Sequence, residues 1–213
     1  GTVDLGCVAS SGEVVIGSNQ DFSLSDPSCS APQQNMSQAA DPLSDLPVPA
    51  RPLDLQSIPS SGDQIVLQPG LYASGMDLRG NIILEPGLYY VENSFRVNAN
   101  ANVTVNTGAA DTITPTGSGI VFYFSGALSF AMNGSAFIEL VAPTTGPYDG
   151  VLFFFDPQVT PPNGYQINGT FSGGMTGAIY APSAPLILSG TSAVGQGVGT
   201  LEAPCLQIVA RTI

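Results

Sequence analysis

The chain has 213 residues, of which 43% are hydrophobic, and this is enough apolar material for one large domain with a sizeable core. Only 9% of the residues are charged, against a usual share of roughly 25%, and the formal net charge is −12 with no histidine and no lysine. A chain this acidic is repelled by phosphate backbones and anionic lipid, so we exclude nucleic acid as a partner; we also find no membrane span in this fragment.

The first part of the chain, residues 1–61, is predicted to hold short strands and a proline-rich strap. Thr2–Asp4, Val14–Ile16 and Phe22–Leu24 have the composition of short strands, whereas the prolines of the 41–52 segment favour an extended connector. We expect this region to cap or to start the domain that follows. Because Thr2–Asp4 already has the pattern of a strand, any export signal or anchor is expected upstream of it.

The three cysteines are Cys7, Cys29 and Cys205, and their spacing matches no zinc motif. In an exported protein, we expect a disulfide between Cys7 and Cys29. Buried free thiols are the alternative, and the sequence leaves the connectivity open. We predict no cofactor.

From Gly62 onward the chain repeats a short unit. Apolar runs recur, most of them opened by glycine: Gly70-Leu71-Tyr72, Gly87-Leu88-Tyr89, Gly119–Phe124, Gly150–Phe155, Gly177–Tyr180 and Cys205–Val209. Most are followed by two further strand-like segments, such as Met76–Leu78 and Ile82–Leu84, with a small polar turn of the Arg79-Gly80-Asn81 kind between them. Asparagine and glycine suit the left-handed backbone of tight corners.

Three short strands per unit, with a polar corner at a fixed place, predict an all-β fold in which residues 62–213 form a right-handed parallel β-helix. The hand is inferred from the rule for parallel crossovers. A β-sandwich would also contain short strands, but its hairpins would not repeat the same glycine-led run at the same point of each unit. No stretch of the chain has a convincing helical period.

Several motifs resemble the β-helical region of TadG-like proteins, which are associated with bacterial tight-adherence (Flp-type) pili. The matching segments are 41–47, 67–72, 119–124, 140–154 and 177–186, and they include the fairly specific Ala142-Pro143-Thr144-Thr145-Gly146-Pro147-Tyr148. Their order covers nearly the whole chain. The resemblance implies an envelope protein whose N-terminal membrane segment is absent here, and it implies no catalytic residues. Phe153–Pro157 departs from it, because a more polar continuation would be expected there.

Many parallel β-helices act on polysaccharides, and that chemistry needs carboxylate clusters or Ca²⁺ with a basic residue. Asp77, Arg79 and Arg96 are the best candidates. We interpret Asp77 and Arg96, which hold equivalent places in neighbouring units, as a stacked outward ion pair rather than as catalytic residues. Asp149 and Asp156 flank an apolar run, and we interpret them as solvated turn residues rather than as a Ca²⁺ site. We therefore predict no catalytic and no metal-binding residue.

The aromatic-rich runs leave two interpretations open. Alternation along the strands predicts an exposed aromatic surface of Tyr123, Phe153 and Phe155 that could stack on sugars; alternatively, the rings form a ladder inside the coil. The sequence favours a non-enzymatic, extracellular or cell-envelope module with a structural or adhesive role. Its expected partners are copies of itself, other surface or pilus subunits, or glycans. The alternatives are a carbohydrate-binding or polysaccharide-degrading β-helix and an ice-binding protein.

Overall fold

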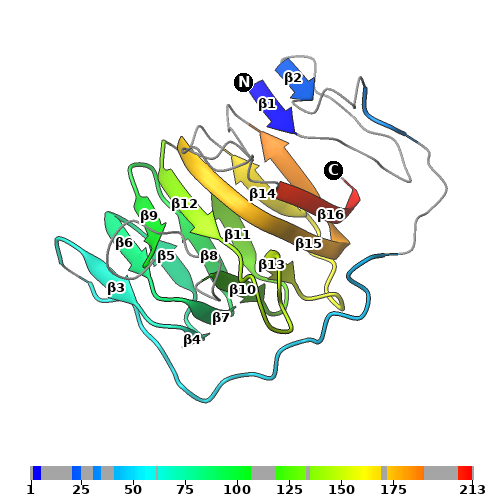
Figure 1. The fold of residues 1–213 in the computed structure, drawn as a ribbon. Coiled ribbons are helices and arrows are strands. Elements are labelled where there is room, and N and C mark those ends of the chain that lie inside the picture. Colours follow the sequence, from blue (N-terminus) through cyan, green and yellow to red (C-terminus); the bar gives the residue numbers. More distant parts are fainter. Residues whose placement is uncertain are drawn as a thin grey trace.

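The computed structural model describes residues 2–5, 21–24, 31–34, 41–60, 62–106, 119–132, 135–168, 172–189 and 206–212. Every regular element in these segments is a β-strand, and nearly all of the strands wind into one coil (Figure 1). Among the residues described, no helix has the length and hydrophobicity that a membrane crossing requires.

The strands of the coil stack into three faces. The first face, which carries the glycine-led runs, contains β4 (Gly70–Tyr72), β7 (Gly87–Val91), β10 (Ile120–Phe124), β13 (Val151–Phe155), the middle of β15 (Ser172–Ser189) and β16 (Leu206–Thr212). The second contains β5 (Met76–Leu78), β8 (Ser94–Val97), β11 (Ser129–Met132), β14 (Tyr165–Asn168) and the end of β15. The third contains β3 (Ile65–Leu67), β6 (Asn81–Leu84), β9 (Asn102–Val105), β12 (Phe137–Val141) and the start of β15.

All of these pairings are parallel, and each turn of the chain visits the third, first and second faces in the same order. The predicted parallel β-helix is therefore confirmed. The long strand β15 bends around the coil, so that it pairs with β12, then β13 and then β14.

The glycine-led runs stack on one face as predicted, although their registers are offset. Leu88 lies opposite Val121, but Leu71 lies opposite Tyr90, two residues further along β7 than the repeat suggests. A two-residue offset keeps every side chain on its own side of the sheet. The glycines are required by the corner that precedes the run: Gly70 and Gly87 have φ angles of 140° and 141°, which L side chains rarely adopt.

Side chains that point into the coil form its main core. The largest of them are fully buried aromatic residues: Tyr72, Tyr89, Phe95, Phe122, Phe124, Phe153, Phe155 and Tyr165. Neighbouring rings contact one another, with centroids 4.6 Å apart for Phe124–Phe155 and 5.2 Å apart for Tyr89–Phe122. The predicted interior ladder of aromatic residues is therefore present.

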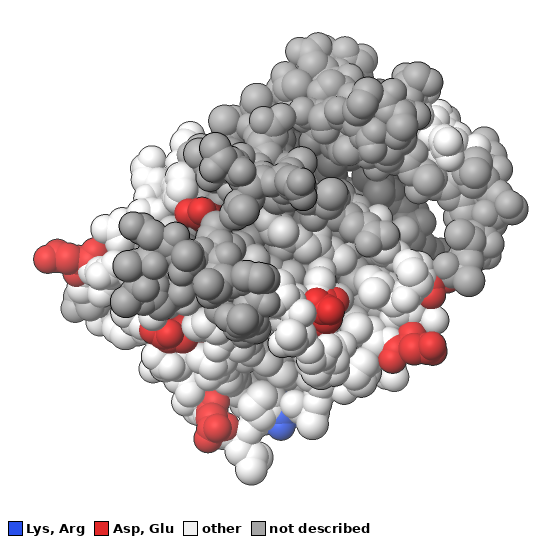
Figure 2. Space-filling model, viewed as in Figure 1, with Lys and Arg blue, Asp and Glu red and all other residues white. Residues whose placement is uncertain are grey.

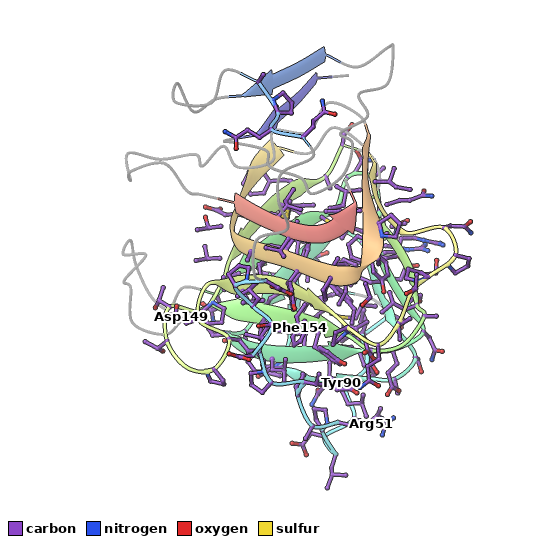
Figure 3. All side chains as sticks on the ribbon, turned by 90° about the vertical axis from the view of Figure 1, so that its right-hand side faces the viewer. Arg51, Tyr90, Asp149 and Phe154 are labelled. Atoms are coloured by element: carbon purple, nitrogen blue, oxygen red, sulfur yellow. The ribbon has the colours of Figure 1, made fainter. Side chains whose placement is uncertain are left out.

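The described parts of the N-terminal region lie at one end and along the side of the coil. β1 (Thr2–Leu5) and β2 (Asp21–Leu24) form a separate parallel pair, which lies near β15 and β16 in both views (Figures 1 and 3). Residues 41–60, which we call the strap, run from the side of β15 to the opposite end of the coil, where β3 begins. The predicted strand at Val14–Ile16 and all three cysteines lie outside the described residues, so the Cys7–Cys29 disulfide stays a prediction.

Candidate functional site

The outer side of the first face carries a continuous row of apolar and aromatic side chains. The strand registers align one residue from each successive strand, and we call this set the outer row: Leu71, Tyr90, Tyr123, Phe154, Tyr180 and Val209. Ring centroids along it are 5.0 Å apart for Tyr90–Tyr123, 5.1 Å for Tyr123–Phe154 and 5.4 Å for Phe154–Tyr180. The first face is thus apolar on both of its sides.

The predicted exposed aromatic surface of Tyr123, Phe153 and Phe155 is wrong. Tyr123 and Phe155 are each 1% exposed and Phe153 is fully buried. Phe153 and Phe155 both belong to the interior core, because a bulge in β13 between Val151 and Phe153 turns Leu152 inward as well. Tyr123 does lie on the outer side, as alternation requires, but this side is covered by other parts of the chain.

The strap provides part of that cover. Leu43 and Leu46 pack against the outer row, and Tyr148 joins them from the loop that precedes β13. The Tyr180 hydroxyl donates a hydrogen bond of 2.7 Å to Oδ2 of Asp41, which fixes the start of the strap over β15. In Figure 3 the strap passes Phe154 and Tyr90 on its way to Arg51, so it crosses the first face from β15 towards β4.

An ion pair also holds the strap beside the end of β7. Nε of Arg51 lies 2.7 Å from Oε1 of Glu92, and Nη2 of Arg51 lies 3.0 Å from Oε2. The guanidinium therefore donates two hydrogen bonds to the carboxylate. The hydrogen bonds from Arg51 lower the pKa of Glu92 below its usual value. Since Arg51 is exposed, this pair contributes orientation more than stability.

The end of the strap pairs with β4, the first strand of the first face. Gln56 N donates to Leu71 O at 2.7 Å, and Leu71 N donates to Asp54 O at 2.9 Å, so Leu55 pairs in parallel with the edge of β4. Three residues later, Ile58 packs against the interior core. The strap therefore covers the side of the first face and then caps one end of the helix.

Burial favours the neutral form of two tyrosines of the outer row, Tyr123 and Tyr180. It raises the pKa of Tyr123 and of Tyr180 well above the ordinary value, and the nearby carboxylates Asp156 and Asp41 raise them further. A protonated Tyr180 remains a donor to Asp41, so this contact persists across the physiological range of pH.

A groove of about 620 Å³ lies beside the cap. Its lining includes polar side chains of the strap end and of the first turns of the coil: Gln56, Ser57, Ser60, Ser74, Asp77, Arg79 and Ser94. Nη2 of Arg79 lies 2.6 Å from Oδ2 of Asp77, and this contact is the main cause that lowers the pKa of Asp77. The groove therefore presents a carboxylate that is already paired and several hydroxyl groups.

The structure corrects the predicted partner of Asp77. Asp77 and Arg96 do lie opposite each other in register, as their equivalent places in the repeat suggested. However, Asp77 pairs with Arg79, its neighbour two residues along, while Arg96 contributes only a weaker electrostatic effect on the pKa of Asp77.

The other predicted candidates lie in turns. Asp156 accepts hydrogen bonds from the backbone N–H groups of Gln158 at 2.9 Å and of Gly126 at 3.4 Å, which stabilise the turn after β13. Asp149 lies in the loop before β13. In the part of the chain that is described, no group of three or more Asp, Glu, His or Cys residues could hold a metal ion. Figure 2 shows the acidic side chains of one face scattered singly.

Sequence reasoning missed the contact between the strap and the outer row. A signal for it exists, because Val121–Phe124 and Val151–Phe155 are unbroken apolar runs, and such runs are typical of strands buried on both sides. Comparison of the chain with known protein families, with curated proteins and with solved structures gives no match.

Proposed function

We propose that the chain is a non-enzymatic structural or adhesive module that acts outside the cell, on a bacterial surface or in a pilus-associated assembly. The observation that carries the proposal is the covered outer row. Its rings pack against the chain's own strap, so the aromatic residues stabilise the side of a rod instead of forming a platform for a ligand. The resemblance of the strap and coil motifs to TadG-like proteins supports the same assignment.

The surface chemistry also supports a location outside the cell. With 9% charged residues, the polar surface is built mostly from Ser, Thr, Asn, Gln and Gly, a composition common in exported bacterial β-proteins. Immunogold labelling of intact cells of the source organism tests the proposal. We expect label on the cell surface or along filaments, and label confined to the cell interior would overturn the assignment.

A second candidate function, carbohydrate binding, is favoured by the groove beside the cap. Its serine hydroxyls, the Gln56 amide and the Asp77–Arg79 pair are groups that hydrogen-bond sugars. A panel of immobilised glycans tests it, with Ser94→Leu as the variant that fills the groove and Ile187→Ser, far along the coil on β15, as the control. Binding that Ser94→Leu abolishes and Ile187→Ser retains would favour this candidate.

A further inference from the structure

The end segment of the strap extends the first face by one more strand, and the outer edge of that strand is open. Gln56 N and Asp54 O point to Leu71, as their hydrogen bonds show. Backbone groups alternate sides in an extended strand, so the N–H and C=O of Leu55 point away from β4. No strand of the described residues pairs with them. The first face therefore ends in outward backbone donors and acceptors.

The side chains at this edge are unusually apolar for a surface. Leu53 is 95% exposed and Leu55 is 68% exposed, the two highest values among the large hydrophobic residues described. Leu55 lies opposite Leu71, so it stands at the end of the outer row. Proteins usually protect such an edge with lysine, but this chain has none, and here Pro52 and Pro59 only limit its length. An open edge with exposed leucines marks a site for another strand.

The opposite end of the same face has a matching strand. β16 is the last strand of the first face, and within the described residues it pairs only with β15. β1 and β2 pair with each other in a separate sheet and form no ladder with β16. Val209 of β16 continues the outer row beside Tyr180. Within the described residues, both ends of the face are thus strand edges of the same direction.

We propose that copies of this chain associate head to tail, with β16 of one copy pairing in parallel with Leu53–Ser57 of the next. Val209 of the first copy then lies beside Leu55 of the second, so that the outer row continues from copy to copy. The contact joins two different surfaces, and such contacts repeat into open filaments when they do not close into a ring. This inference deepens the proposed structural role and depends on it for its biological purpose.

The net charge sets how this association responds to salt. Each copy carries a formal charge of −12, so copies repel one another, while the proposed contact consists of backbone hydrogen bonds and apolar side chains. Raising the salt from about 0.01 M to about 1 M shortens the Debye length from about 30 Å to about 3 Å and screens the repulsion. Association should therefore strengthen with salt, whereas a contact made by opposite charges would weaken.

Sedimentation equilibrium of the purified 213-residue chain, over a range of concentrations at both salt levels, tests the proposal. We expect the average mass to rise with concentration, and to rise more at high salt. A monomer at all concentrations and at both salt levels would overturn the inference, as would an association that weakens with salt. Surface labelling of cells is measured separately, so failure of self-association leaves the proposed location to its own test.

Two variants locate the contact. Leu53→Lys and Leu55→Lys place a charge at the open edge, and we expect each to weaken association by about tenfold or more. Because Leu53 is 95% exposed, its substitution should leave the fold intact even if Leu55→Lys does not. Val48→Lys is the matched control, since Val48 is a 50% exposed apolar residue of the strap outside the proposed contact. Equal association by Leu53→Lys, Leu55→Lys and the unchanged chain would refute the proposed contact.

Discussion

Two tyrosines of the interior core should respond in opposite ways to loss of the hydroxyl group. Tyr165 is fully buried between Phe155 and Phe130, with ring centroids 3.9 Å and 5.9 Å away. Its hydroxyl has no hydrogen-bond partner among the described residues. Tyr89 is equally buried, but its hydroxyl lies 2.8 Å from Leu67 O and 2.7 Å from Glu85 O. The ring packing is retained when either tyrosine becomes phenylalanine.

The expected magnitudes follow from the state of each hydroxyl. A buried polar group without a partner costs about 1–3 kcal/mol, so Tyr165→Phe should raise the free energy of unfolding by about 1 kcal/mol. Tyr89→Phe removes a satisfied hydrogen bond and should lower it by about 1 kcal/mol. For a chain of this length, each change corresponds to a shift of about 2–4 °C in Tm.

Urea and thermal unfolding of the two variants beside the unchanged chain measure these shifts. Tyr72→Phe is a useful third variant, because the Tyr72 hydroxyl donates to Gln68 O at 2.7 Å in a partly buried site and should show a loss no larger than that of Tyr89→Phe. If Tyr165→Phe lowers stability as much as Tyr89→Phe does, then the Tyr165 hydroxyl is partnered and the reasoning is refuted.

Four further predictions concern the strap, the pH range, catalysis and the cysteines. Leu43→Ala and Leu46→Ala each remove apolar contacts with the outer row, so each should lower stability by about 1–2 kcal/mol and speed proteolysis within the strap; unchanged cleavage would argue against the cover. Burial raises the pKa of both Tyr72 and Tyr165 to about 12, above an unfolded value of about 10. The folded chain therefore binds more protons above pH 10, so urea melts should show stability that is constant from about pH 7 to about pH 10 and falls towards pH 12; a flat profile over this alkaline range would contradict this. Pectin and alginate should not be turned over, and a rate that vanishes in a folded Asp77→Ala variant would reject the non-enzymatic assignment. Mass mapping should find Cys7 bonded to Cys29, and alkylation of both without reduction would reject the bond.

The repeat could be predicted from the sequence because its corners are chemically demanding. Gly70 and Gly87 open their runs with φ angles that L side chains rarely adopt, so the same Pro-Gly-Leu-Tyr letters recur at the start of these two runs. Short segments such as Met76–Leu78 alternate apolar and polar residues, because one side faces the core and the other faces solvent. These local requirements predict the three faces without any tertiary contact.

The cover on the first face could not be derived in the same way. Alternation correctly placed Tyr123 on the outer side of β10, but whether an outward side is solvated depends on a distant segment. Two contacts that hold the strap join residues far apart in the chain, and no sequence pattern relates them. They are the hydrogen bond between Tyr180 and Asp41 and the ion pair between Arg51 and Glu92. The bulge in β13 also broke the alternation on which the exposure of Phe153 was predicted.

The strap also determines where the proposed association can occur. An uncovered outer row would be an apolar stripe along the whole side of the rod, and such a stripe would favour unspecific lateral aggregation. By packing Leu43 and Leu46 over the rings, the strap removes that stripe, and by pairing Leu55 with Leu71 it moves the open edge to the end of the rod. The apolar surface that remains at Leu53 and Leu55 is small and has outward backbone groups beside it. A contact there requires a strand of the correct direction, which restricts association to the axis of the coil. The same segment thus covers the outer row against lateral contacts and carries the edge at which we propose axial association.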